Sequence, residues 1–320
     1  MSFTDNGEQT NQAPLVSVIL LCYMQQDYVK EAVQSLLNQD YENIEYIFSD
    51  DCSSDETFNI ISNEVESDEY KNRVFLNKNK TNLGLVPHFN YVLSLTKGDI
   101  IVVAAGDDIS LPDRVTKTVS ILNRKDISFV SFNDEVIDTK GKTLSVGQRV
   151  QCDDLRTLDI SDYLSGINPG FSGASRGFKR EVYDVFGDLN VDCPTEDTPY
   201  ILRGLLLGNG AVSPDIAIKY RRHNSNLSGD DLIQKMSVDS IFSQYEKDVG
   251  VAKKLGFVDD DDLSEFIEWH KSNLQKRKIV QRYQKCRFDY KVYFCNILFS
   301  SKFSSREKYA FLKKCNFWNR

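Results

Sequence analysis

The sequence lacks the features that would place it in a disulfide-rich, zinc-binding or membrane-spanning class. Its seven cysteines are odd in number and widely spaced, and no two form a C-x-x-C pair, so neither a disulfide framework nor a structural zinc site is indicated. No apolar run reaches the roughly 18 to 20 residues that a bilayer span needs. The polar N-terminal stretch MSFTDNGEQTNQAP shows no signal-peptide pattern. We therefore expect a cytoplasmic protein with free thiols.

The composition is that of a folded protein. Hydrophobic residues make up 41% of the 320 positions and charged residues 27%, which supplies enough apolar surface for a sizeable core and argues against intrinsic disorder. This length fits one large α/β domain, or a main domain with a smaller appendage.

The formal net charge of −8 is unevenly distributed along the chain. Residues 271–320 carry 14 Lys and Arg against two acids, a segment charge of +12, which leaves −20 for residues 1–270. An acidic body argues against general nucleic-acid binding. In the basic tail, aromatic and aliphatic residues alternate with Lys and Arg, as in helices that lie on anionic lipid. The alternative is a helical lid packed on the acidic body.

Hydrophobic periodicity divides the chain into segments. After a flexible tail at residues 1–13, strand-like and helix-like patterns alternate four times within residues 14–125, which predicts a doubly wound open sheet. Residues 126–225 have shorter strands and a Gly-rich loop, and residues 226–320 have helical periodicity almost throughout. We therefore predict an α/β main domain at 14–225, in two halves, followed by a helical C-terminal region.

Two acidic clusters follow predicted strands. Asp50 and Asp51 come directly after the strand NIEYIFS, at the sheet edge where open α/β sheets bind ligands, although the next residues would also suit helix caps. Asp107 and Asp108 end the strand-like segment GDIIVVAAG. Their mutual repulsion would be costly without a cation, and hard oxygen ligands suit Mg²⁺ or Mn²⁺ bound together with phosphate. A helix cap is the alternative for Asp108.

Two further clusters could carry chemistry. Glu196 and Asp197 lie at the start of a predicted helix, either as a cap or as a general base facing a cleft. The segment YRRHN places Arg221, Arg222 and His223 just after a predicted strand. These side chains could neutralise a departing diphosphate, or they could form a solvated basic turn.

Taken together, the motifs resemble a known family. In order along the chain they are VSVILLCY, SDDCSSDET, NLGLVPHFNYVLSLTKGD, AAGDDISLPDR, TEDTPYILR and YRRHNSNLS. The set resembles the family 2 (GT-A) glycosyltransferases, inverting enzymes that take a sugar from a nucleotide-diphosphate donor, and covers about residues 14–228. The resemblance implies a GT-A-like, Rossmann-like open mixed sheet flanked by helices.

The resemblance also implies roles for individual residues. Nucleotide binding would fall to Tyr23, Asp50, Asp51 and Asp107. The Mn²⁺ or Mg²⁺ ligands would be Asp108, Asp107 and His223. Arg222 and His223 would close over the diphosphate, Gly173 would lie in a loop that approaches the sugar, and Asp197, next to Glu196, would be the catalytic base.

The chain departs from the family at two positions. Many members have Asn where this chain has Met24, and Gly where it has Cys52, which affects donor details rather than the fold. No Q-x-x-R-W segment follows the Glu-Asp pair, so we expect transfer of a single sugar rather than processive synthesis.

The implied activity is metal-dependent transfer from a nucleotide-diphosphate sugar, with UDP-sugar the expected donor, to a saccharide hydroxyl. If the basic tail binds lipid, the acceptor would be lipid-linked, as in bacterial O-antigen or capsule assembly at the inner face of the plasma membrane. One alternative is a sugar-phosphate nucleotidyltransferase, but such enzymes usually carry a Gly-rich basic loop where this chain reads CYMQQDY. Another is a non-catalytic nucleotide-sugar-binding protein, which would leave Glu196 and Asp197 without a chemical role.

Overall fold

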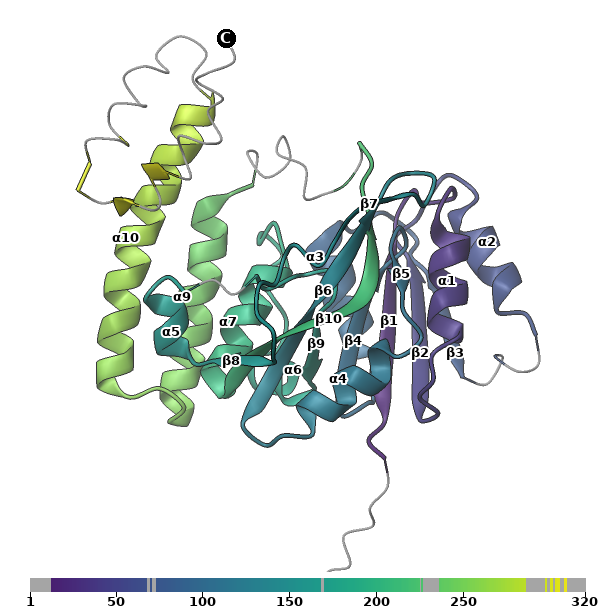
Figure 1. The fold of residues 1–320 in the computed structure, drawn as a ribbon, viewed down its shortest axis with the longest axis horizontal. Helices are drawn as coiled ribbons and strands as arrows, with labels where there is room; N and C mark the ends of the chain where they lie inside the picture. The colour runs from purple at the N-terminus through teal and green to yellow at the C-terminus, as the bar shows by residue number, and fades with distance from the viewer. Residues whose placement is uncertain are drawn as a thin grey trace, which may run out of the picture.

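The computed structural model describes residues 13–67, 70, 73–167, 170–224, 226 and 236–285, with isolated residues between 297 and 309. Within these residues the strands form one sheet (Figure 1). The strands are β1 (Val16–Cys22), β2 (Ile44–Asp50), β3 (Val74–Lys78), β4 (Ile100–Ala105), β5 (Ile109–Ser110), β6 (Ile127–Ile137), β7 (Thr143–Val146), β8 (Arg156–Leu158), β9 (Gly177–Lys179) and β10 (Asn209–Arg221).

The sheet combines a parallel half with a mixed half. Its order is β3-β2-β1-β4-β9-β6-β10-β5, with β7 paired to β6 and β8 to β10. The first four strands in this order are parallel, whereas β9 runs antiparallel to both β4 and β6. This arrangement confirms the predicted open mixed sheet, and β7 pairs antiparallel with β6 as a hairpin.

Helices cover both faces of the sheet, which explains the unbroken apolar runs in its central strands. They are α1 (Val29–Leu37), α2 (Thr57–Glu64), α3 (Leu85–Ser94), α4 (Arg114–Leu122), α5 (Ile160–Leu164), α6 (Glu181–Phe186), α7 (Asp197–Leu207), α9 (Val238–Leu255) and α10 (Asp260–Lys285). Along β1, Val18 and Leu20 pack with α1, α2 and α4, whereas Ile19 packs on the opposite face with α3, α6 and α7. Because successive side chains of a strand point to opposite faces of the sheet, β1 contributes to two apolar cores, one on each face.

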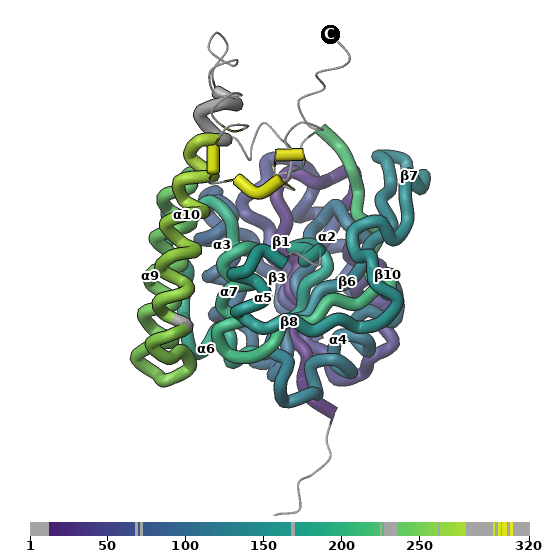
Figure 2. Tube along the Cα trace, turned by 60° about the vertical axis from the view of Figure 1, so that its left-hand side comes forward, coloured from purple at the N-terminus to yellow at the C-terminus, as the bar shows by residue number. Residues whose placement is uncertain are grey.

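The C-terminal helices α9 and α10 lie side by side, on the far side of α7 from the sheet (Figures 1 and 2). An aromatic cluster joins them, with the ring of Phe242 5.9 Å from that of Trp269 and 4.9 Å from that of His270. The apolar core that begins at Ile19 extends as far as Phe266, so these helices share a core with the main domain. The division of the chain at residues 125 and 225 stays a prediction.

Two further predictions concern the cysteines and the membrane-spanning capacity of the helices. Cys22, Cys52, Cys152 and Cys193 are free thiols, as expected. None of the helices that the structure describes is both long and apolar enough to cross a bilayer. The basic tail is described mainly as the end of α10, and most of residues 286–320 lie outside the described part, so both interpretations of it stay predictions.

A buried ion pair fastens α9 to α7. The guanidinium of Arg203 donates to Asp248 at 2.9 and 3.0 Å, and both side chains are fully buried. Gln244 donates to the same carboxylate at 2.8 Å. Burial raises the pKa of Asp248, and the hydrogen bonds and charge of Arg203 oppose that rise.

We predict that Asp248→Asn lowers the free energy of unfolding by about 3–5 kcal/mol, because it leaves a buried guanidinium without its counter-charge. Denaturant unfolding measures this loss. Asp126→Asn is the matched control, since it breaks an exposed 3.0 Å pair with Arg124 and should leave the unfolding midpoint unchanged. Equal effects of the two substitutions would contradict the role given to burial.

Candidate functional site

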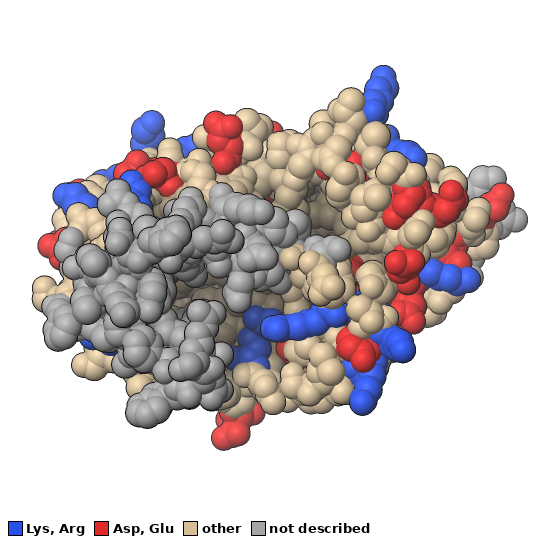
Figure 3. All heavy atoms as spheres, turned by 90° about the horizontal axis from the view of Figure 1, so that it is seen from above, with Lys and Arg blue, Asp and Glu red and all other residues tan. Residues whose placement is uncertain are grey.

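Three parallel strands end side by side, and this register brings the predicted residues together. Cys22 of β1 lies opposite Asp50 of β2, and Leu21 lies opposite Ala105 of β4. The ladder continues past the strand ends, because Asp51 N–H donates to Cys22 O at 2.9 Å and Gly106 N–H to Leu21 O at 3.2 Å. The residues that follow each strand therefore share one edge of the sheet, which is viewed from above in Figure 3 and is hollowed near its centre.

Asp51 is held at this edge by donors from the segment before α3. Its carboxylate accepts the Asn79 amide at 2.8 Å and the backbone N–H groups of Leu83 and Gly84, each at 2.9 Å. Gly84 has φ +83°, which favours glycine. A carboxylate has about four acceptor positions, so room for about one further donor remains.

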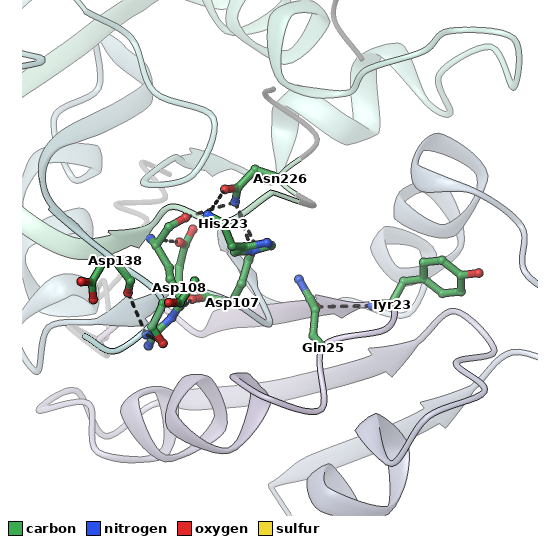
Figure 4. Close-up of polar contacts among 9 residues, drawn as sticks. Tyr23, Gln25, Asp107, Asp108, Asp138, His223 and Asn226 are labelled. Carbon is green, nitrogen blue, oxygen red and sulfur yellow. Dashed lines mark hydrogen bonds and ion pairs between the residues drawn. The ribbon is translucent and has the colours of Figure 1, made fainter. Parts of the chain in front are cut away.

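Asp50 is fully buried, and Asp51 is nearly so, with 3% of its surface exposed. The Asp50 carboxylate accepts Ser53 N–H at 3.0 Å and also the Ser53 hydroxyl, whose oxygen in turn accepts Met24 N–H at 2.8 Å. Asp50 thus joins the loops after β1 and β2 and does not present its carboxylate at the edge, unlike the nucleotide contact that the resemblance implies. Tyr23 does project from this edge, with 49% of its surface exposed (Figure 4).

The two departures from the family adopt left-handed backbone. Met24 has φ 54° and Cys52 has φ 63°, and no other non-glycine residue in the described chain has a positive φ. Asn and Gly tolerate this conformation better than other residues, which accounts for their presence at these positions in many family members. The chain therefore keeps the backbone of the two loops while changing the side chains.

Asp107 belongs to a hydrogen-bonded group at the end of β4 (Figure 4). Its Oδ2 lies 2.8 Å from Nε2 of His223 and 3.3 Å from the Asn226 amide, while His223 N–H donates to Asn226 Oδ1 at 2.6 Å. The His223 ring stacks on Tyr28, with the ring centroids 5.0 Å apart. The segment after β10 is thus folded back onto Asp107.

Asp108 lies beside Asp107 but faces Arg221. Its Oδ1 accepts Arg221 N–H at 2.9 Å, and only 7% of its surface is exposed. Burial and the neighbouring charge of Asp107 raise the pKa of Asp108 well above its ordinary value, against the opposing effects of Arg221 and Arg114. The ionised form of this carboxylate therefore needs additional positive charge.

These residues fit a divalent cation that binds together with phosphate. Mg²⁺ and Mn²⁺ sites of that kind take one or two protein carboxylates and obtain their remaining ligands from phosphate and water. Asp107 and Asp108 supply two adjacent carboxylates, and imidazole nitrogen is an acceptable further ligand. In the part of the chain that the structure describes, no three Asp, Glu, His or Cys side chains form a complete protein cage, so the ligand set that includes His223 stays a prediction.

Arg221, named in the sequence analysis as one of three side chains that could neutralise a diphosphate, is 1% exposed and therefore buried. It donates through Nε to Asp107 O at 3.0 Å, pairs with Glu31, and its guanidinium lies 4.9 Å from the Tyr28 ring centroid. Arg222, the predicted diphosphate ligand, is exposed, and its side chain makes no hydrogen bond or ion pair with described residues. Of two adjacent arginines, only the inward-facing one is fixed, as strand alternation at the end of β10 requires.

The second half of the predicted main domain, which the resemblance would make the acceptor half (residues 126–225), reaches the same edge through β9. Because β9 runs antiparallel to β4, residues 173–176 extend alongside the end of β4, where Val103 N–H donates to Arg176 O at 3.3 Å. A Cβ added to Gly173 would lie 2.8 Å from both Cβ and Oδ2 of Asp197. The structure therefore brings Gly173 and Asp197 into direct contact, and the roles that the resemblance implies for them stay predictions.

Asp197 and Glu196 have different surroundings. Oδ1 of Asp197 accepts the Thr195 hydroxyl at 2.5 Å and Thr198 N–H at 2.7 Å. Glu196 makes no side-chain cap bond to α7; it pairs instead with Arg176 at 2.7 Å. Capping thus accounts for part of the Asp197 contacts and for none of the Glu196 contacts. Sequence reasoning missed Arg176, because a lone Arg in a Gly-rich loop gives no signal.

Comparison with known proteins identifies the family. Residues 17–187, more than half of the chain, match the model of glycosyl transferase family 2, so the chain belongs to that family. One relative, the putative teichuronic acid biosynthesis glycosyltransferase TuaG of Bacillus subtilis, is 32% identical over 120 residues, which are 38% of this chain and 46% of TuaG. The matches to the first curated relatives cover between 40% and 68% of those proteins' lengths.

Solved structures agree on the fold. The crystal structure of S. aureus TarS 1-349 in complex with UDP-GlcNAc superposes with a TM-score of 0.53 at 15% identity, covering 81% of this chain and 80% of that one. The mannosyltransferase PcManGT from Pyrobaculum calidifontis, in complex with GDP-Man and Mn²⁺, gives 0.54 at 16% identity, with coverages of 75% and 65%. These superpositions agree with the GT-A type of fold that the resemblance implied.

We predict that Gly173→Ala lowers glycosyltransferase turnover by about 10²-fold, because the added methyl group displaces Asp197. Initial-rate kinetics with saturating donor measure the effect. Gly250→Ala in α9 is the control, because its Cβ would meet nothing within 4 Å, and it should retain full activity. A fully active Gly173→Ala enzyme would separate this loop from the chemistry.

Proposed function

We propose that this glycosyltransferase moves one sugar, with inversion, from a UDP-sugar to a hydroxyl group of a saccharide acceptor. The observation that carries the proposal is the convergence of Asp51, Asp108 and Asp197 on one edge of the sheet. Donor-side residues come from the ends of β1, β2 and β4, and the acceptor-side residues come from the loop before β9 and the start of α7.

The nucleotide would bind along the ends of β1 and β2. Tyr23 offers an exposed ring for the base, and the remaining acceptor position of Asp51 suits an imide N–H of uracil. The UDP-GlcNAc complex of a protein with the same fold supports a UDP donor, whereas the GDP-Man complex of the other shows that the fold also accepts guanine nucleotides.

The diphosphate would lie over the ends of β4 and β10. Asp107 and Asp108 would hold Mn²⁺ or Mg²⁺, with His223 next to them, and the cation would neutralise charge on the departing nucleoside diphosphate. The exposed side chain of Arg222 makes no ion pair with the described residues and could turn toward the phosphates. Mn²⁺ in the PcManGT complex supports a divalent cation in this fold.

Asp197 would be the general base. Its Oδ1 is occupied by Thr195 and Thr198, whereas Oδ2 accepts no hydrogen bond from the described residues and lies against Gly173. An acceptor hydroxyl placed there would give its proton to Oδ2 as its oxygen attacks the anomeric carbon, while the bond from that carbon to the diphosphate breaks.

Two observations support a lipid-linked saccharide as the acceptor. The name of TuaG, a relative, refers to teichuronic acid biosynthesis, which is compatible with synthesis of a surface polysaccharide such as O-antigen or capsule. The +12 charge of residues 271–320 supports peripheral attachment to an anionic membrane and a lipid-linked acceptor. Membership of the family favours sugar transfer over nucleotidyl transfer or binding without turnover.

We predict that Asp197→Asn still binds donor but transfers sugar about 10²–10⁴-fold more slowly, the usual contribution of a general base. Release of UDP on adding acceptor measures transfer, and calorimetric titration with UDP-sugar measures binding. Asp192→Asn, an exposed substitution in the loop before α7, is the control and should transfer at the wild-type rate. Wild-type turnover by Asp197→Asn would remove the base assignment.

We predict that Mn²⁺ strengthens UDP-sugar binding in the wild-type protein and has no such effect in Asp108→Asn. The wild-type protein should gain about 2.7 kcal/mol of stability at a donor concentration of 100 times its Kd. Thermal unfolding with UDP-sugar, in Mn²⁺ and in EDTA, measures the difference. Asp113→Asn, which removes an exposed partner of Lys117, should behave like wild type. Equal donor binding in Mn²⁺ and EDTA would contradict metal-assisted binding.

A further inference from the structure

Arg176 connects the two segments that carry the acceptor side of the site. It lies just before β9, and only 3% of its surface is exposed. Its Nη1 donates to Gly173 O at 2.7 Å and its Nη2 to Glu196 Oε1 at 2.7 Å. The guanidinium also lies 5.3 Å from the ring centroid of Phe89 in α3. One buried side chain therefore fixes the Gly-rich loop and the start of α7 relative to each other.

This contact also determines the charge balance beside Asp197. Glu196 and Asp197 are adjacent carboxylates, and Glu196 is 8% exposed, so an unpaired charge there would be costly. Arg176 supplies the counter-charge for Glu196. Asp197 has no ion-pair partner in the described structure and receives hydrogen bonds only through Oδ1. The pair thus presents one neutralised carboxylate and one uncompensated oxygen, Oδ2.

We propose that Arg176 is a positioning residue for the catalytic base, and this inference rests on the proposed function. By neutralising Glu196 and holding the carbonyl of Gly173, it makes Asp197 Oδ2 the single proton acceptor that faces the acceptor hydroxyl. Arg176 touches no substrate in this scheme and acts entirely through its neighbours. Its Nε has no hydrogen-bond partner among the described residues, which leaves one buried donor unsatisfied.

Two tyrosine hydroxyls near Asp197 do not titrate in the working range. Tyr163 of α5 and Tyr245 of α9 lie close enough for the charge of Asp197 to act on them. Burial raises the pKa of both hydroxyls, so both stay neutral near pH 7, and Arg277 of α10 acts on the same two groups as a fixed positive charge. A substitution in the Arg176–Glu196 ion pair therefore changes the charge next to Asp197 without altering the two tyrosines or Arg277.

Charge-changing variants test the proposal through the acid limb of the pH profile of kcat/KM for the acceptor. Arg176→Met leaves Glu196 uncompensated, which favours protonated Asp197 and should move the midpoint up by about one pH unit. Glu196→Gln leaves Arg176 uncompensated and should move the midpoint down. The double variant removes both charges, so its midpoint should return to the wild-type value.

Turnover provides a second readout. Arg176→Met should lower kcat by about 10- to 100-fold with little change in donor affinity, because the loop and α7 lose their shared anchor. Arg124→Met, which breaks an exposed ion pair far along the chain from the site, is the matched control and should leave both kcat and the midpoint unchanged. Thermal unfolding identifies variants that do not fold, and the near-isosteric Glu196→Gln then carries the test through its predicted downward shift.

The outcomes separate this inference from the function it rests on. Opposite shifts in the two single variants, cancelled in the double variant, support it. If Arg176 had only a structural role, its variants would show lower unfolding temperatures and lower rates at every pH, with an unchanged midpoint. That result would overturn the inference about Arg176. The assignment of Asp197 as the base would still stand if the Asp197→Asn enzyme were inactive. An active Asp197→Asn enzyme would overturn both.

Discussion

The structure depends on the parallel pairing of β1, β2 and β4, whose carboxyl ends lie in one row. This register places three chain segments with acidic side chains at a single edge, where their charges would repel each other in the absence of partners. The fold resolves that conflict locally. The Asp51 carboxylate accepts a hydrogen bond from the backbone at the start of α3, and the Asp107 carboxylate contacts the His223 ring. The Asp108 carboxylate accepts a hydrogen bond from the backbone N–H of Arg221.

Each half of the site satisfies its carboxylates in a different way. On the proposed donor side, Asp107 and Asp108 lie next to each other, and nearby arginines offset their negative charge only in part. This excess of negative charge favours a bound cation, which in turn can bind an anionic diphosphate. On the acceptor side, Arg176 neutralises Glu196 and leaves Asp197 with one unoccupied oxygen. Under the proposed function, this difference in counter-charge is the reason that metal binding is assigned to one acidic cluster and proton transfer to the other.

Much of the fold could be predicted from local patterns. The apolar runs of β1 and β4 and the alternation with helices indicated a parallel sheet covered on both faces, and the Asp residues after β2 and β4 lie where such a sheet binds ligands. The outcome for individual residues was less complete. The Asp50 carboxylate is hydrogen-bonded to Ser53. Of the two adjacent arginines, Arg221 rather than Arg222 is held by hydrogen bonds.

By itself, the sequence determined the order of strands and helices, the edge at which the acidic residues collect and the family to which the chain belongs. Those properties follow from periodicity and short motifs, which are local along the chain. Only the tertiary structure decided which carboxylates stay available. The partners of Glu196 and Asp107 come from other loops and strands, the most distant of them Asn226, 119 positions away from Asp107. Burial and counter-charge are set by those long-range contacts, and no local pattern encodes them.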